Sequence, residues 1–172
     1  EIAQCLVGSE MCIRDRDELR PFLPQISALR SHGTTSVLCR IDPNGYSWIY
    51  MPSPDHRSHR IICTGNFSRN NNNGDITTAT IEFSEQMTEE EIRRQLELIP
   101  FSPSYLAHHW EEYTYPVQDA SSRALIRELK ERLEPRGIYL LGRFAEWEYY
   151  NMDAAIGAAM DLDKRLDAEL QP

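Results

Sequence analysis

Short apolar runs separated by turn residues occupy the first half of the chain. Their β-branched and aromatic residues favour strands, and the runs cover Ser36–Ile41, Tyr46–Met51, His59–Thr64 and Thr77–Phe83. The turn sequence Asp42-Pro43-Asn44-Gly45 lies between the first two runs, so we expect these two strands to form a hairpin. Short connections join antiparallel neighbours, and the pattern therefore predicts an antiparallel sheet.

Helical and strand-like patterns alternate in the second half. Thr88 begins a predicted helix, because Glu91 three residues later completes a capping box. Asp119–Leu133 repeats its apolar residues with a helical period, and Met152–Leu170 is the last predicted helix.

Two further segments are typical of strands. His108–Val117 predicts a fifth strand, whose pairing Pro116 limits. Ile138–Leu141 is wholly apolar, a pattern that favours a strand buried on both faces, as in a parallel sheet. These elements together predict an α+β fold.

Composition narrows the functional classes. The chain of 172 residues has 27 acidic and 18 basic residues and a net charge of −9, with no basic stripe, so we expect no nucleic-acid partner. No apolar run has the length of a membrane helix, so we expect no membrane span. The four cysteines form no CxxC pair and the paired histidines have no third ligand nearby in sequence. We therefore expect free thiols, no metal site and a cytoplasmic protein.

The first residues have a pattern foreign to natural proteins. Residues 6–16 read LVGSEMCIRDR, which resembles the translation of a transposase adapter used in sequencing libraries. A match of this length in one frame is not expected by chance, so we interpret residues 1–16 as an artefact and set them aside. Natural coding sequence would then begin near Asp17, within a longer gene.

One segment carries a recognisable chemical pattern. Residues 142–158 read GRFAEWEYYNMDAAIGA, a polar and aromatic loop that leads into a helix. Backbone N–H groups at a helix start favour anionic oxygen, and Arg143 adds a planar cation suited to a diphosphate. The residues alone are equally compatible with an anionic-ligand site and with a surface arginine and core aromatics beside an ordinary helix.

The same segment resembles a known motif. GRFAEWEYYNMD is similar to the carboxy-terminal flavin motif of UDP-galactopyranose mutases and of amine-oxidase-like flavoproteins, including the protoporphyrinogen-oxidase-like group. Weaker similarities precede it at Tyr115-Pro116-Val117 and at His59-Arg60-Ile61. The resemblance implies a substrate-binding-type domain over residues 17–135. It also implies that residues 136–172 are the last strand and helix of an incomplete Rossmann-type FAD domain.

The resemblance implies a set of FAD-binding residues around the start of the last helix. Gly142 and Arg143 would bind the cofactor, together with Asn151, Met152 and Asp153. Met152 would present its backbone N–H to the pyrimidine edge of the flavin. Asn151 departs from the mutase pattern, which has Asp at this place, and this difference argues against mutase chemistry.

The resemblance also implies roles toward a small-molecule substrate. Tyr115, Tyr149 and Arg143 would bind a substrate phosphate or diphosphate, as in a nucleotide-sugar, and Arg60 would be the catalytic residue near the reactive centre.

No GxGxxG lies between a strand and a helix in this chain. The resemblance therefore implies a missing N-terminal Rossmann half as partner, and we expect this chain alone neither to bind FAD tightly nor to turn over. Three functions stay open. They are an FAD-dependent oxidoreductase, a mutase-type isomerase acting on a nucleotide-sugar through reduced flavin, and a non-catalytic module that binds a nucleotide-sugar or a partner.

Overall fold

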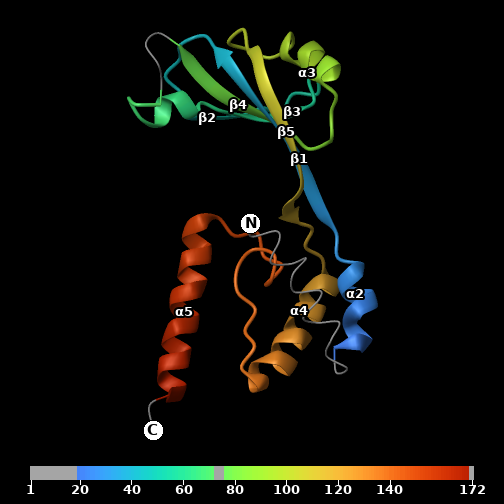
Figure 1. Cartoon of the computed structure of the whole chain (residues 1–172). Coiled ribbons are helices and arrows are strands. Elements are labelled where there is room, and N and C mark those ends of the chain that lie inside the picture. The colour runs from blue at the N-terminus through green and yellow to red at the C-terminus, as the bar shows by residue number, and fades with distance from the viewer. Residues whose placement is uncertain (1–18, 72–75, 171–172) are drawn as a thin grey trace. The chain divides into compact units, whose positions relative to one another are not determined.

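The computed structural model describes residues 19–71 and 76–170, which belong to two compact units. Residues 32–114 form one of them, which we call the sheet unit (Figure 1). The described residues up to Ser31 and from Tyr115 onward form the other, the helix unit. The predicted artefact, residues 1–16, lies outside the described residues. The predicted boundary between residues 135 and 136 stays a prediction.

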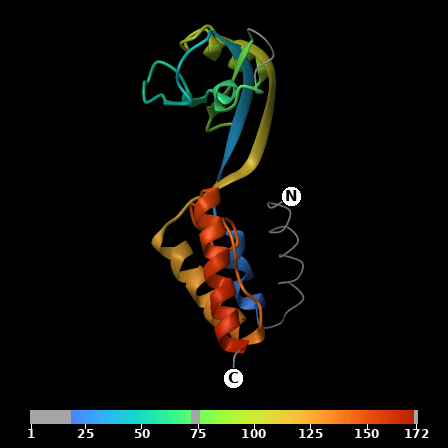
Figure 2. The ribbon, with the colours of Figure 1, turned by 90° about the vertical axis from the view of Figure 1, so that its left-hand side faces the viewer.

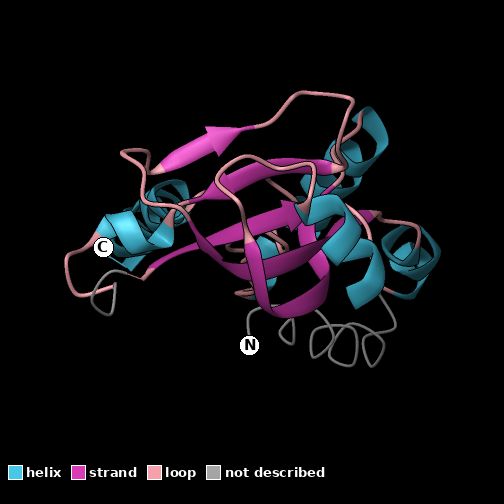
Figure 3. Ribbon diagram, turned by 90° about the horizontal axis from the view of Figure 1, so that it is seen from above, coloured by secondary structure: helices cyan, strands magenta, loops and turns pink. Residues whose placement is uncertain are grey.

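A five-stranded antiparallel sheet together with helices confirms the predicted α+β class, whereas the assignment of residues 136–172 to a Rossmann-type FAD domain stays a prediction. The strands are ordered β2-β3-β4-β1-β5. Seen from above, the sheet is twisted rather than flat (Figure 3). Its strands are β1 (Ser31–Ile41), β2 (Trp48–Tyr50), β3 (Ser58–Ile62), β4 (Thr77–Phe83) and β5 (Ser104–Pro116).

The predicted hairpin between the first two strands is wrong. β1 pairs with β4, from Thr35 opposite Phe83 to Ile41 opposite Thr77, whereas β2 pairs with β3. The side chain of Asn44 closes its own loop: its amide donates to Asp42 O, and its oxygen accepts from the N–H of Tyr46. The long β1 gains more ladder hydrogen bonds from β4 than the three residues of β2 offer.

The core of the sheet unit lies between the sheet and α3 (Glu89–Leu96). α3 begins where predicted, since Thr88 and Glu91 form the reciprocal capping box. Cys39 and Cys63 are free, buried thiols, as expected, and burial raises the pKa of Cys39 to about 12. The buried residues that connect the strands with α3 are Val37, Cys39, Ile61, Ile81, Phe83, Ile92 and Leu96.

The helix unit contains α2 (Leu23–Ser27), α4 (Ala120–Leu133) and α5 (Met152–Leu170). α4 and α5 point the same way, so residues 137–151 run back along the helices to join them (Figures 1 and 2). No helix in the described ranges is both long and apolar enough to cross a membrane. The core of this unit consists of Leu19, Phe22, Leu125, Ile126, Leu129, Leu133, Phe144 and Trp147.

The predicted strand Ile138–Leu141 is absent. The described strands belong to one sheet, and none of them pairs with this segment, so its backbone lacks the ladder that defines a strand. Ile138 and Leu140 instead pack against the α4 core, while Leu141 is 42% exposed. The apolar run therefore covers the core from one side as an extended segment.

Candidate functional site

Two left-handed residues shape the loop before α5. Gly142 has φ 95° and Trp147 has φ 53°. The N–H of Glu146 donates to Gly142 O, and the N–H of Glu148 donates to Arg143 O, both at 2.9 Å. Glycine adopts a left-handed conformation without strain. Trp147 has a Cβ, so its contacts must hold it there.

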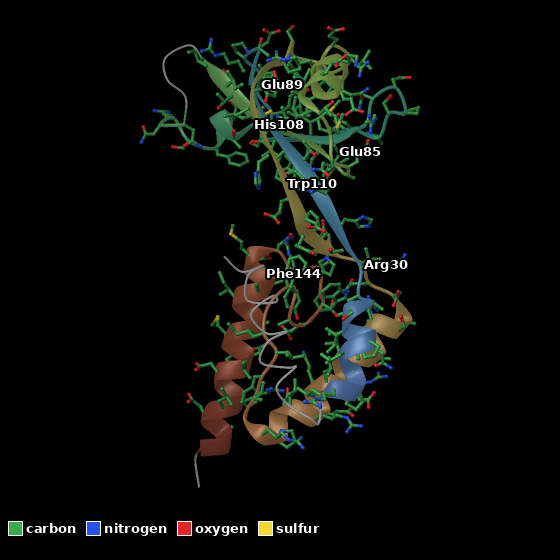
Figure 4. The ribbon with its side chains drawn as sticks, turned by 45° about the vertical axis from the view of Figure 1, so that its right-hand side comes forward. Arg30, Glu85, Glu89, His108, Trp110 and Phe144 are labelled. Carbon is green, nitrogen blue, oxygen red and sulfur yellow. The ribbon has the colours of Figure 1, made fainter. Side chains whose placement is uncertain are left out.

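Trp147 anchors this loop to the segment that follows β5. Its indole N–H donates to Val117 O at 3.0 Å, and its own carbonyl accepts from Gln118 Nε2 at 3.0 Å. The ring is buried and packs edge-on against Phe144, which Figure 4 labels. Tyr115 lies two residues before Val117, so the anchor fixes Tyr115 relative to the loop.

Three residues that the sequence assigns to the site come together here, and we call them the Arg143 cluster. The rings of Tyr115 and Tyr149 stack with centroids 4.9 Å apart and planes at 14°. Arg143 Cζ lies 4.8 Å from the Tyr115 centroid and 5.9 Å from that of Tyr149. Arg143 Nε donates to Tyr150 O at 2.8 Å, and Nη2 donates to the same oxygen. Tyr149 is 54% exposed, so solvent reaches the cluster.

A partly buried salt bridge supports the loop from the side of α4. Lys130 Nζ lies 2.7 Å from Glu146 Oε1, and Glu146 Oε2 accepts from the Gly142 N–H at 3.0 Å. Burial raises the pKa of Tyr150, and the Glu146 and Glu148 carboxylates raise it further. Glu146, Glu148 and Tyr150 line a hollow of about 560 Å³ together with residues of α4.

The start of α5 is open to solvent. Asn151, Met152 and Asp153 are exposed, and Met152 is 85% exposed. The N–H of Ala155 donates to Asn151 O at 3.0 Å, so the preceding N–H groups lie before the first hydrogen bond of the helix. Such a helix start attracts anionic or electron-rich oxygen.

Arg60 belongs to the sheet unit, on β3. Its Nε and Nη2 donate to Glu82 Oε2, and its Cζ lies 5.0 Å from the centre of the Trp48 ring. Burial alone would raise the pKa of Glu82. The hydrogen bond with His59 and the charge of Arg60 outweigh burial and hold this pKa below its ordinary value. Arg60 therefore has an ionised counter-ion.

Of three comparisons with known proteins, only the one with solved structures found a similarity to this chain. No protein-family model matches the sequence, and no curated protein is significantly similar to it. The crystal structure of reduced UDP-galactopyranose mutase superposes on 75% of this chain with a TM-score of 0.63 and 19% identity. The chain shares its fold with part of UDP-galactopyranose mutase. A candidate protoporphyrinogen oxidase from Exiguobacterium sp. 255-15 matches 86% of the chain with a TM-score of 0.54 and 12% identity.

This chain spans about a third of each of these proteins, 32% of the mutase and 37% of the oxidase. At sequence identities of 19% and 12%, the comparison shows a shared fold. It confirms the predicted resemblance to UDP-galactopyranose mutase and protoporphyrinogen oxidase over part of their chains. The roles of single residues stay predictions. In residues 19–71 and 76–170, no three His, Cys, Asp or Glu side chains gather as metal ligands.

Sequence reasoning missed the residues that support the site. Gln118 and Lys130 hold the loop of residues 142–151 from other segments, and nothing in their local sequence marks them. Glu82 had one signal, a carboxylate between the apolar residues Ile81 and Phe83 of a strand.

Proposed function

We propose that this chain is part of an FAD-dependent enzyme of the oxidoreductase superfamily, with the Arg143 cluster and the start of α5 facing the flavin. One observation carries the proposal. Tyr115, Arg143 and Tyr149 converge beside the exposed start of a long helix, in a chain whose fold resembles part of UDP-galactopyranose mutase.

The residues present fit one edge of such a cofactor. When bound, FAD would supply the redox or covalent chemistry, and the protein would orient it and adjust its charge. The Met152 N–H, in the first turn of α5, would donate to an electron-rich oxygen of the flavin ring. Gly142 has no atom within 4 Å of the place of a Cβ, so its backbone leaves room for a phosphate beside Arg143. Asn151 and Asp153 would lie on either side of the Met152 contact with the flavin.

The remaining site residues would bind substrate. Arg143 and the stacked Tyr115 and Tyr149 combine a planar cation with aromatic faces and hydroxyls, a set that suits a phosphorylated small molecule. Arg60 would be the catalytic residue of the sheet unit, with its charge balanced by Glu82.

The upstream gene sequence provides the test. The proposal predicts a nucleotide-binding half encoded before Asp17, and a protein that includes it should be yellow and keep FAD after desalting. Arg143→Gln should weaken retention of FAD or binding of UDP at least about tenfold, because a charge-assisted contact contributes about 1.5–3 kcal/mol. Arg127→Gln, at an exposed position of α4, is the matched control. A colourless extended protein that ignores added FAD would overturn the proposal.

The Arg143 cluster specifically favours a second candidate, a mutase-type isomerase, because a cation against two tyrosines suits a nucleotide-sugar. Asn151 argues against it, since an amide cannot supply the charge of the Asp in the mutase pattern. Incubating the reduced and oxidised extended protein with UDP-galactopyranose separates the candidates. A ring-contracted product from reduced protein alone identifies the isomerase. Binding of the nucleotide-sugar by a protein without flavin identifies a non-catalytic module.

A further inference from the structure

β5 forms a long edge of the sheet. It stands at one end of the strand order, after β1, and among the described residues no strand pairs with its outer side. β5 has 13 residues, whereas β2 at the opposite edge has three. An edge strand presents unpaired N–H and C=O groups to any other strand. Because β2 is so short, β5 is the edge at which this sheet can be extended.

Several features that keep an edge strand from pairing are absent from β5. Residues 104–115 include neither lysine nor proline, and Pro116 is the last residue of the strand. Leu106 and Tyr113 are 42% and 46% exposed. The N–H of Tyr113 donates to the Glu111 carboxylate of its own strand at 3.3 Å, an acceptor that a partner strand could replace. β5 therefore offers backbone groups and apolar side chains to a partner.

The middle of β5 reads HHWEE, and this motif is complementary to itself. When two copies run antiparallel with Trp110 opposite Trp110, His108 lies opposite Glu112 and His109 lies opposite Glu111. A histidine ring has an N–H donor in either protonation state and a carboxylate accepts, so each cross-strand pair joins a donor to an acceptor. A shift by two residues would place Glu111 opposite Glu111 or His109 opposite His109. The four side chains are exposed, and they favour one register.

The geometry of the motif leaves room for a second copy. The side chains of His109 and Glu111 are 78% and 51% exposed, and His109 Nε2 lies 3.9 Å from Glu111 Oε2. The Trp110 ring reaches over β1, since a Cβ added to Gly33 would lie 2.2 Å from its Cη2. Figure 4 labels His108 and Trp110 on this strand. The ring is therefore turned toward its own sheet, and the outer edge stays accessible at the centre of the motif.

We propose that this chain forms a symmetric dimer in which two β5 strands pair antiparallel about Trp110. The two sheets then continue into each other across the dimer. The two-fold axis makes the interface isologous, so each complementary pair occurs twice. Backbone hydrogen bonds between the strands supply affinity, and the histidine–glutamate pairs select the register and the partner. A strand of another sequence leaves these charged groups unmatched.

The test reverses one half of the motif at a time. In the histidine variant, His108→Glu and His109→Glu place carboxylates opposite carboxylates. In the glutamate variant, Glu111→Lys and Glu112→Lys place lysines opposite histidines. Each variant alone should dimerise at least about tenfold more weakly than wild type, because it loses every complementary pair of the motif. An equimolar mixture should recover the affinity, since each glutamate of one chain then lies opposite a lysine or a histidine of the other.

Sedimentation velocity at several protein concentrations measures the affinities, and circular dichroism verifies that each variant is folded. The matched control carries Glu90→Lys and Glu97→Lys, at two exposed positions on and just after α3 in the same unit. It has the net charge of the glutamate variant but keeps the motif. The control should dimerise like wild type, and mixing it with the histidine variant should not recover that variant.

A monomeric wild-type chain would overturn the proposal, and so would a mixture that associates no better than its components. Equal recovery with the α3 control would show that overall charge drives association. Hydrogen exchange of the wild type adds a readout without substitutions: amides of residues 106–114 should exchange more slowly at high protein concentration, and those of β2 should not. Equal exchange in β5 at both concentrations would also contradict the dimer. FAD retention tests the proposed function separately, because these measurements need neither flavin nor substrate.

Discussion

Trp147 combines a strained backbone with a buried ring and two hydrogen bonds to one neighbouring segment. A left-handed conformation costs a residue with a Cβ about 1–2 kcal/mol, so the contacts of Trp147 must exceed that cost. Its bonds to Val117 and Gln118 join two parts of the chain that are far apart in sequence. Trp147 is therefore the residue that stabilises the geometry of the Arg143 cluster.

Trp147→Phe should lower the free energy of unfolding of the helix unit by about 2 kcal/mol. The change removes one hydrogen bond, worth about 1 kcal/mol, and part of a buried ring. Urea unfolding followed by circular dichroism measures this loss. Trp48→Phe, at a site that is 40% exposed, is the matched control and should change stability by less than about 0.5 kcal/mol. Equal midpoints for both variants would show that the indole N–H does not hold the loop.

At the scale of elements, local chemistry could be predicted and pairing could not. α3 begins at its capping box and β4 covers the predicted residues, because neighbouring residues determine both. The β1–β4 pairing depends on segments far apart in sequence. Whether Ile138–Leu141 forms a strand also depends on a distant segment that would have to pair with it. The same division applies to the site. The motif located Arg143 and Tyr149, whereas the supporting residues Gln118 and Lys130 come from other segments and carry no local signal.

β1 and β5 approach each other closely where Gly33 meets Trp110, which Figure 4 labels. A Cβ on Gly33 would lie 2.2 Å from Trp110 Cη2 and 2.8 Å from the backbone oxygen of Glu111. Gly33→Ala should therefore destabilise the sheet unit by about 1–3 kcal/mol, as overpacking does. Thermal unfolding provides the measurement. Gly45→Ala, where a Cβ meets nothing within 4 Å, should leave the midpoint unchanged, and an equal loss in both variants would refute the steric explanation.

At the scale of the whole molecule, α5 is a long helix that the described chain leaves uncovered. None of its described side chains is buried. Met152, Ile156 and Met160 follow one another at the spacing of a helix face and are 85%, 61% and 57% exposed. Contiguous exposed apolar surface promotes association, so this stripe makes the isolated chain prone to bind itself.

Replacing Ile156 and Met160 by lysine should lower the self-association of this chain without lowering its thermal midpoint. Sedimentation velocity at several protein concentrations measures the change. Lysines at Asn70 and Gln86, both exposed and polar, add the same charge away from the stripe and should leave association as it is. If both pairs of substitutions act alike, net charge and not the stripe controls association.

The hydrogen bond from the Val117 N–H to Arg30 O, 2.8 Å long, lies where the chain leaves the helix unit and where it returns. The two chain ends that border residues 32–114 thus meet side by side. Residues 32–114 could therefore be deleted as one coding segment, with a few turn residues joining Ser31 directly to Tyr115. The same two junctions would also allow this segment to be replaced by a related sheet.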